Sequence, residues 1–198
     1  MVKIDNLPNS KPYELLKKYF YEAKSAKQQP IDAILICSYN KEANEVDARF
    51  VNIKYILSEE WIFFSNYNSS KAKDFLTHDQ ITAIWYWSNI DLQIRIKANI
   101  KKTSQTISDK HFSERLKEKN ALSISSMQSK EIKSHKKVIE NYNKVLKENN
   151  LSERPEYWGG YSFTPYYFEF WEGHKHRINR REAFNKSGDK WIHSKLQP

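Results

Sequence analysis

The 198-residue chain is long enough for one sizeable domain, and its 39% hydrophobic and 14% aromatic residues exclude a disordered protein. A formal net charge of +9 indicates an anionic partner, either a nucleic acid or a phosphorylated small molecule. The basic residues are spread along the chain, without an arm of consecutive cations or an RNA-binding motif. We therefore expect no nucleic acid.

The single cysteine, Cys37, excludes a disulfide within the chain. It lies in the apolar run 33–37, where a small buried thiol of a cytoplasmic protein is expected. The N-terminus carries Asp5 and lacks the apolar core of a signal peptide, and no apolar run is long enough to span a membrane. We predict a cytoplasmic protein with no membrane partner.

The first part of the chain predicts one helix followed by three strands. Ser10 is a typical N-cap and Pro12 a typical first-turn residue, and the apolar residues that follow at helical spacing predict a helix that ends before Pro30. Strands are expected at 33–39, 46–56 and 61–66, joined by turns at 40–44 and 58–60. This order predicts consecutive hairpins, followed by a short helix at 71–76.

Two further strands, 81–87 and 91–103, precede two helices. In 91–103, apolar residues at 92, 94, 96, 98 and 100 alternate with polar residues at 93, 95, 97 and 99, which predicts one core face and one polar or ligand face. The aromatic run 85–87 should pack in the core or a dimer interface, or stack a planar ligand. Helices are expected at 108–119, capped by Ser108, and at 128–148.

The C-terminal region is rich in aromatic residues and arginines. Strands are expected at 161–163 and 166–171, separated by Thr164-Pro165 and followed by an arginine cluster, which we interpret as a hairpin with cations beside an aromatic surface. Gly159-Gly160 allows a close approach to the backbone, and Gly173 indicates a tight turn. Together the elements predict one domain, 1–198, mainly β with helices (α+β), arranged as a β-barrel.

The segment 154–198 carries the most specific pattern in the chain. It contains Arg-Pro-x-x-Trp-Gly-Gly-Tyr at 154–161, Glu-Phe-Trp-x-Gly at 169–173, Arg-x-x-x-Arg at 177–181, Trp191 and a closing Leu-Gln-Pro. This pattern resembles the C-terminal dimerisation and substrate segment of the FMN-dependent pyridoxamine 5′-phosphate oxidases. The resemblance implies an FMN-binding split barrel that forms a homodimer, with FMN at the subunit interface.

The same resemblance extends to two strands and a turn earlier in the chain, and it implies a set of cofactor-binding residues. Arg49, Ser65 and Lys71 would hold FMN, with Lys71 on the phosphate beside a helix N-terminus near Ser70. Gln93 would contact the flavin ring. The full set is Arg49, Phe64, Ser65, Ser70, Lys71, Gln93, Gln128, Ser129, Trp171 and Arg181, of which Gln128 and Ser129 would reach FMN from the other subunit.

The substrate half departs from the family pattern. Lys54, Arg115 and Arg177 match its substrate-binding positions. By contrast, His111 stands where the family has a phosphate-binding tyrosine, Lys119 where it has a serine, and Asn179 where it has a histidine; Ser70 and Arg180 replace an arginine and an aspartate. The expected substrate-binding residues are Lys54, His111, Arg115, Lys119, Arg177 and Asn179. A regular strand would place Arg49 and Lys54 on opposite faces, so either a bulge intervenes or they serve different ligands.

The resemblance implies an oxidase that converts pyridoxine or pyridoxamine 5′-phosphate into pyridoxal 5′-phosphate. A hydride from the substrate C4′ carbon would pass to the flavin, and dioxygen would then take the electrons and form hydrogen peroxide. The altered substrate half leaves two alternatives open, an oxidase with another substrate, as in phenazine biosynthesis, and a flavin-binding module without turnover. The pair His174 and His176 lacks further ligands at metal-binding spacing, and we expect no metal.

Overall fold

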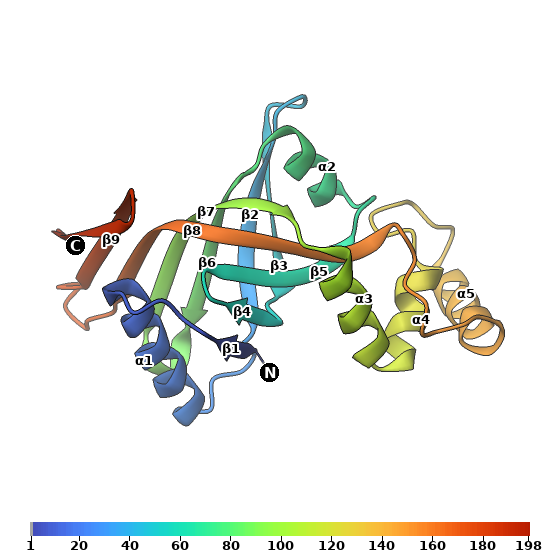
Figure 1. The fold of residues 1–198 in the computed structure, drawn as a ribbon, viewed down its shortest axis with the longest axis horizontal. Helices are drawn as coiled ribbons and strands as arrows, with labels where there is room; N and C mark the ends of the chain where they lie inside the picture. Colours follow the sequence, from blue (N-terminus) through green and yellow to red (C-terminus); the bar gives the residue numbers. More distant parts are fainter. Residues whose placement is uncertain (1) are drawn as a thin grey trace.

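The computed structural model describes residues 2–198, in which all strands belong to one ten-stranded sheet (Figure 1). The strand order is β1-β4-β5-β8-β7-β6-β2-β3, and β9 pairs with both β8 and β10. The strands are β1 Lys3–Asp5, β2 Ala33–Asn40, β3 Glu45–Asn52, β4 Tyr55–Leu57, β5 Glu60–Asn66, β6 Gln80–Trp87, β7 Leu92–Lys102, β8 Trp158–Glu172, β9 Arg180–Ser187 and β10 Lys190–Leu196. Apart from the parallel β1–β4 pair, all pairings are antiparallel.

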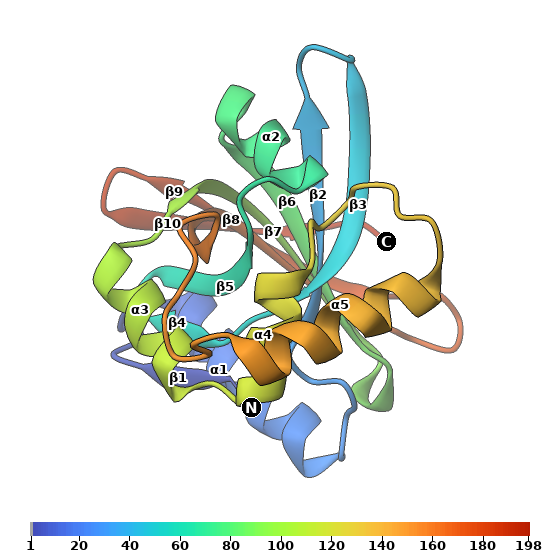
Figure 2. The ribbon, with the colours of Figure 1, turned by 90° about the vertical axis from the view of Figure 1, so that its right-hand side faces the viewer.

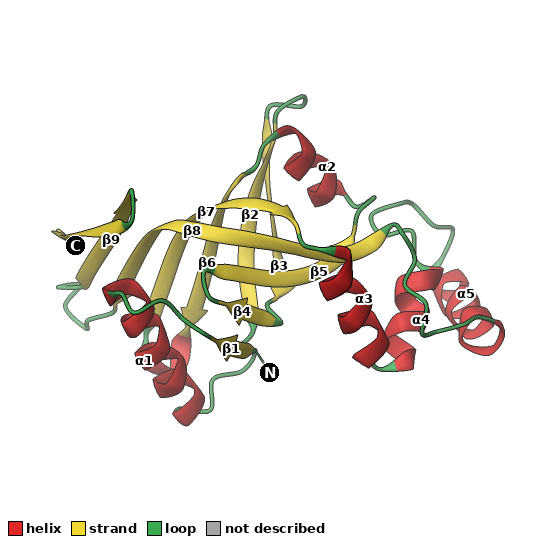
Figure 3. Ribbon diagram, in the orientation of Figure 1, coloured by secondary structure: helices red, strands yellow, loops and turns green. Residues whose placement is uncertain are grey.

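The helices lie around the sheet and not within it (Figure 3). They are α1 Lys11–Ser25, α2 Ser70–Thr77, α3 Gln105–Glu114, α4 Lys117–Ser125 and α5 His135–Glu148, with a short 3₁₀ helix η1 at Ser88–Ile90. Helices α3, α4 and α5 gather at the end of the sheet where β8 begins, and α1 lies toward the opposite end (Figure 1). Helix α2 lies beside β2 and β3 (Figure 2).

The core lies on the inner face of the curved sheet. The alternation predicted for β7 is confirmed, because its residues at 92, 94, 96, 98 and 100 are buried and the intervening ones are more exposed. Trp61, Trp85 and Trp87 are fully buried and pack in a row, with ring centroids 5.2 and 5.0 Å apart. Helix α1 closes this core through Tyr13 and Phe20, and burial of so many rings supplies the main driving force for the fold.

The strand predicted at 46–56 is interrupted. β3 ends at Asn52, and the amides of Ile53 and Lys54 donate to the carbonyls of Asp32 and Ile62, at 2.9 and 2.8 Å. The chain thus leaves its partner β2 and joins β5 as β4 within two residues. This crossing, rather than a bulge inside one strand, sets the relative directions of Arg49 and Lys54.

The two strands predicted at 161–163 and 166–171 form one continuous strand, β8. Pro165 does not end it, because the register with β7 shifts between Lys97 and Ala98, so that Lys97 pairs with Tyr167 and Ala98 with Pro165. The extra residue, Tyr166, forms a β-bulge next to Pro165, and prolines are tolerated in strands at bulges. The predicted hairpin is therefore displaced: the turn lies between β8 and β9, where His174 and His176 occupy a loop and not a strand face.

The helical predictions for 108–148 are correct in type but wrong in their boundaries. The helix predicted at 108–119 is two helices, α3 and α4, and α3 is capped by Ser104, whose side chain accepts from the amide of Ile107. The helix predicted at 128–148 begins only at His135, where Ser134 is the N-cap. Residues 126–134 form an irregular loop instead.

Cys37 is partly exposed rather than fully buried, because it lies on the outer face of β2. Within residues 2–198 no helix combines the length and the apolar composition that a membrane crossing requires.

Candidate functional site

A cavity of about 440 Å³ opens between β3, β5, the start of α2 and the start of β8. Seven of the ten predicted cofactor residues line it: Arg49, Phe64, Ser65, Ser70, Lys71, Gln128 and Ser129. Three of the six predicted substrate residues line it as well: Lys54, His111 and Arg115. Residues distant in sequence therefore converge on one polar cavity, which is the default location for a ligand.

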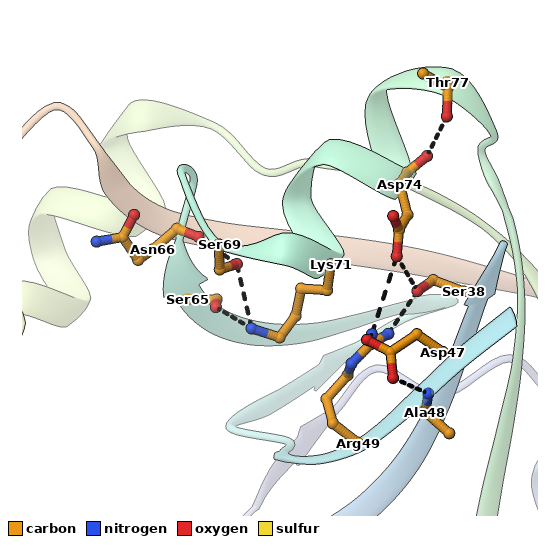
Figure 4. Close-up of polar contacts among 10 residues, drawn as sticks. All are labelled: Ser38, Asp47, Ala48, Arg49, Ser65, Asn66, Ser69, Lys71, Asp74 and Thr77. Carbon is orange, nitrogen blue, oxygen red and sulfur yellow. Dashed lines mark hydrogen bonds and ion pairs between the residues drawn. The ribbon is translucent and has the colours of Figure 1, made fainter. Parts of the chain in front are cut away.

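Lys71 is the most unusual residue of the cavity, because it is a buried cation (6% exposed). Its ammonium group donates to Ser65 Oγ at 3.1 Å and Ser69 Oγ at 3.2 Å (Figure 4). Among residues 2–198 no carboxylate oxygen lies within 4.0 Å of it. Burial, together with the nearby Arg49, lowers the pKa of Lys71 to about 8.

Arg49 is held in place by groups from two other elements (Figure 4). Its guanidinium donates to Asp47 and to Ser38 Oγ, and it lies 3.9 Å from Asp74 Oδ2. Ser38 in turn donates to Asp74 at 2.6 Å. The buried Asp74 on α2 thereby fixes an arginine on β3, so that this side of the cavity is pre-organised.

Flat rings form one wall of the cavity. Phe64 stacks on His111, with centroids 3.8 Å apart and planes at 6°, and on Trp158, at 5.4 Å and 11°. The guanidinium of Arg115 lies over Trp158 at 5.0 Å. The glycine at 160 is required here, because a Cβ would lie 2.2 Å from Thr103 Cγ2 and 3.1 Å from the Phe64 ring. The expected close approach at Gly159-Gly160 is thus made by the protein's own side chains.

Gln128 and Ser129 come from the loop between α4 and α5. We expected them to reach the site from a second subunit, but they line the cavity of their own chain. Gln128 Oε1 accepts from Ser65 Oγ and from the amide of Asn66, both at 3.3 Å. The loop can fold back because the long helix predicted at 128–148 does not begin until His135.

The remaining cofactor residues, Gln93, Trp171 and Arg181, form a second cluster. Gln93 pairs with Trp171 across β7 and β8, and Trp171 pairs with Arg181 across β8 and β9, so the three lie side by side on one face. The 440 Å³ cavity lies at the other end of β8, where Trp158 lines it. At about 3.3 Å per residue, Trp158 and Trp171 are roughly 40 Å apart along the strand.

The substrate residues are divided in the same way. Lys54 lines the cavity and pairs with Asp32 at 2.9 Å, and it shares this cavity with Arg49 because the chain crosses between strands at 53–54. Lys119, Arg177 and Asn179 do not line it. Lys119 is exposed on α4, and Arg177 and Asn179 lie in the β8–β9 turn, where Asn179 Oδ1 accepts from the amide of His174 at 3.1 Å.

Sequence reasoning missed three residues that shape the cavity. Trp158 belongs to a motif that we recognised, but its role as a wall was not predicted. Asp74 and Asp32 hold Arg49 and Lys54, and neither carries a sequence signal beyond being an acidic residue. A buried carboxylate can be found only once the packing around it is known.

The arrangement fits a ligand that combines a phosphate with a flat ring. The buried ammonium of Lys71, the serine hydroxyls and the first turn of α2 suit a phosphate, and the stacked rings suit a planar group. Within residues 2–198 no cluster of three or more His, Cys, Asp or Glu side chains has the geometry for a metal ion.

Comparison with known proteins decides the family. The chain is 30% identical to a pyridoxine/pyridoxamine 5′-phosphate oxidase from Leptospira biflexa, over 94% of this chain and 89% of the relative. A second such oxidase, from Cytophaga hutchinsonii, is 32% identical over 93% of this chain and 86% of the relative. The chain belongs to the pyridoxine/pyridoxamine 5′-phosphate oxidase family. Residues 158–198 also match the family model described as the pyridoxine 5′-phosphate oxidase C-terminal dimerisation region.

Two solved structures share the fold of this chain. PhzG from Burkholderia lata 383, determined with tetrahydrophenazine-1-carboxylic acid, superposes with a TM-score of 0.90 at 24% identity, covering 96% of this chain and 94% of PhzG. A pyridoxamine 5′-phosphate oxidase-related, FMN-binding protein from Nostoc punctiforme superposes with a TM-score of 0.77 at 11% identity, covering 96% of this chain and 99% of that protein. The predicted split-barrel fold is therefore confirmed.

Proposed function

We propose that the protein is an FMN-dependent oxidase that converts pyridoxine or pyridoxamine 5′-phosphate into pyridoxal 5′-phosphate, with dioxygen as the acceptor. Membership of the oxidase family and the shared fold with an FMN-binding protein point to FMN as the cofactor. The observation that carries the proposal is the buried ammonium of Lys71, which has hydroxyl partners but, among residues 2–198, no carboxylate oxygen within 4.0 Å. A phosphate would supply the missing negative charge.

The proposal includes a homodimer in which each site is completed by the other copy. The cluster of Gln93, Trp171 and Arg181 is too far along β8 to meet a ligand in the cavity of its own chain. A two-fold partner would bring its own Gln93, Trp171 and Arg181 cluster to this cavity. The cavity of the partner would receive the cluster of the first copy in return.

An apolar sheet face supports this dimer. Phe50, Leu35 and Ile84 lie in register across β3, β2 and β6, and the same row continues to Arg95 on β7. Phe50 is 70% exposed, Val46 is 72% exposed and Tyr86 is 56% exposed, which is costly for a sheet facing water. Because this face continues into the Gln93 cluster, a second copy that covers it would also deliver the missing half of the site.

The residues of this chain would mainly bind and orient. Lys71, Ser65 and Ser70 would hold the cofactor phosphate, Phe64 and Trp158 would border its flat ring, and Lys54, His111 and Arg115 would hold the substrate at the same cavity. Bound FMN would supply the redox chemistry, taking a hydride from the substrate and passing the electrons to dioxygen. A fixed set of charges contributes to rate by placing the reacting carbon, not by chemistry of its own.

A direct experiment tests this function. The purified protein should be yellow and release FMN on denaturation. Addition of pyridoxine 5′-phosphate or pyridoxamine 5′-phosphate under air should produce pyridoxal 5′-phosphate and hydrogen peroxide in equal amounts. A colourless protein that ignores added FMN would contradict the proposal at the cofactor.

A second candidate is an oxidase of the same family with another substrate, as in phenazine biosynthesis. The observation that favours it is the altered substrate half, with His111 in the cavity and Lys119 and Asn179 outside it. A yellow protein that oxidises neither vitamer but is reduced by a different substrate would select this candidate. A yellow protein that no substrate reduces would select a flavin-binding module without turnover.

A further inference from the structure

His111 is held between two aromatic rings at the wall of the cavity. It lies in the last turn of α3, stacked on Phe64 with centroids 3.8 Å apart. The ring of Tyr55, on β4, meets it edge-on at 5.5 Å and 86°. The hydroxyl of Tyr55 lies 2.8 Å from His111 Nδ1. The imidazole is thus fixed in position, and Nδ1 is already occupied.

Three cations surround this imidazole and oppose its protonation. Arg115 follows α3, Lys54 precedes β4 and Lys3 lies on β1. Burial, followed by the charges of these three residues, lowers the pKa of His111 to about 4. Burial, followed by the carboxylate of Glu114, raises the pKa of the Tyr55 hydroxyl. At neutral pH the pair therefore consists of a neutral imidazole and a protonated phenol.

A neutral imidazole has one ring nitrogen that donates and one that accepts. The Tyr55 hydroxyl has a single proton, and in residues 2–198 its one hydrogen-bond partner is His111 Nδ1. When the hydroxyl donates this proton in a hydrogen bond to Nδ1, Nδ1 is the accepting nitrogen, and the proton of the neutral imidazole must be on Nε2. In residues 2–198 Nε2 has no hydrogen-bond partner, and His111 lines the cavity together with Arg115 and Lys54.

We propose that Tyr55 fixes His111 as the neutral Nε2–H tautomer, and that this N–H is the donor which, beside Arg115 and Lys54, selects the phosphate of the bound substrate. Tyr55 is then a positioning residue that acts through His111. The inference rests on the proposed function, since it assigns a residue to the phosphate end of the same substrate. It explains how a histidine can stand where the family has a tyrosine, because both residues offer a neutral donor at that place.

Arg115 and His111 would contribute different interactions to the substrate phosphate. Arg115 has no acidic partner within 4.0 Å in the part of the chain from 2 to 198, whereas Lys54 is paired with Asp32. The phosphate would therefore take its main charge contact from Arg115, and His111 would add a directional hydrogen bond without adding a third positive charge. Removing the N–H donor of His111 should weaken binding of the phosphorylated ligand and leave binding of its unphosphorylated analogue unchanged.

The first experiment reads the tautomer directly. In the full-length protein with ¹⁵N-labelled histidine, long-range proton–nitrogen correlation spectra assign the protonated ring nitrogen of His111. We expect a protonated Nε2 and an unprotonated Nδ1 throughout the range from about pH 6 to 8. Tyr55→Phe, which removes only the hydroxyl, should change the His111 spectrum toward a mixture of tautomers. A protonated Nδ1 in the wild type, or a spectrum unchanged by Tyr55→Phe, would overturn the positioning role.

The second experiment uses calorimetry to measure binding of pyridoxine 5′-phosphate and of pyridoxine to the FMN-loaded protein, with the flavin reduced and oxygen excluded so that no turnover occurs. His111→Leu should weaken binding of pyridoxine 5′-phosphate about tenfold or more, as expected for loss of a hydrogen bond to a charged group. Binding of pyridoxine should not change. His111→Gln, which keeps an N–H donor, should recover most of the loss. An undiminished preference of His111→Leu for the phosphorylated ligand would contradict the inference alone. A wild-type protein without any such preference would contradict the proposed function and this inference together.

Discussion

The buried carboxylate of Glu169 on β8 accepts two hydrogen bonds from Arg181 on β9, at 3.0 Å from Nε and 2.8 Å from Nη2. Arg95 and Tyr167 donate to the other oxygen of the same carboxylate. Arg181 also donates to the carbonyl of Gln197 near the end of the chain. The arginine that we assign to the partner's cofactor site is therefore fixed before any ligand is present.

We predict that Glu169→Gln destabilises the protein by about 1–3 kcal/mol, because it leaves two arginines without their buried counter-ion. Urea unfolding measures this change. Glu140→Gln on α5 is the matched control, since its exposed pair with Lys137 should contribute at most about 0.5 kcal/mol. An equal effect of the two substitutions would show that the network around Glu169 adds nothing.

The pH dependence of stability should also report Glu169. Burial raises the pKa of this carboxyl, but hydrogen bonds from Tyr167, Arg181 and Arg95 outweigh burial and hold its pKa below the usual 4.5. A carboxyl whose pKa is lower in the folded protein than in the unfolded chain stabilises the fold at pH values above the unfolded-state pKa. This stabilisation is lost as the pH falls through the folded-state pKa. Acid unfolding below about pH 4.5 should therefore be less steep in Glu169→Gln than in the wild type.

Lys71→Met should weaken FMN binding about tenfold to a hundredfold, because it removes the buried cation of the phosphate site. Lys73→Met is the control, since Lys73 lies on the same helix but is exposed. Fluorescence quenching of added FMN measures both variants. Riboflavin, which lacks the phosphate, should bind the wild type and Lys71→Met with similar affinity.

The affinity for FMN should fall as pH rises above about 8, where the free protein loses the Lys71 proton that a phosphate requires. The bound phosphate raises that pKa, so binding above pH 8 takes up a proton. In Lys71→Met this slope should vanish. A slope that remains in the variant would assign the titration to a different group.

Gly160→Ala should destabilise the protein by about 1–3 kcal/mol, because the added methyl overlaps Thr103 and presses on Phe64. Thermal unfolding measures the loss. In the double variant Gly160→Ala with Thr103→Ala the tighter of the two contacts is removed, and part of the stability should return. If the double variant is no more stable than Gly160→Ala, the clash lies elsewhere.

Asn179→His tests the substrate half. Histidine restores the residue type that the resemblance assigns to this position, and we expect kcat/KM for pyridoxine 5′-phosphate to rise, by up to about tenfold for one charge-assisted hydrogen bond. Asn179→Ala controls for the loss of the hydrogen bond to the His174 amide, which alone should not raise activity. Unchanged kinetics in Asn179→His would count against a limiting role for this position.

Much of the barrel could be predicted from the sequence, because alternation with a period of two is strong in β7 and apolar runs mark β2, β5 and β6. The errors occurred where a local signal competes with tertiary pairing. Pro165 reads as a strand end but lies in a bulge of β8, and Ile53-Lys54 reads as strand but is the crossing from one partner strand to another. The break between α3 and α4 has no glycine or proline to mark it.

The site was predicted in its residues more than in its geometry. The order of the motifs was enough to predict that Arg49, Ser65 and Lys71 share one site, and they line one cavity. It could not reveal that Gln128 belongs to the cavity of its own chain, or that Gln93, Trp171 and Arg181 lie at the far end of β8. Which residues share a cavity depends on how a strand runs across the sheet, and no local pattern records that.

A complementation experiment tests the shared site most directly. Lys71→Ala disables the cavity and Arg181→Ala disables the cluster at the far end of β8, so each homodimer should bind FMN poorly. Mixed dimers carry both changes in one site and neither in the other, so an unbiased mixture should recover about a quarter of the wild-type sites. Lys71→Ala mixed with Arg49→Ala, two changes in the same cavity, should recover none. Failure of the first mixture to bind FMN, with mixed dimers demonstrated by differential tags, would contradict a site built from two copies.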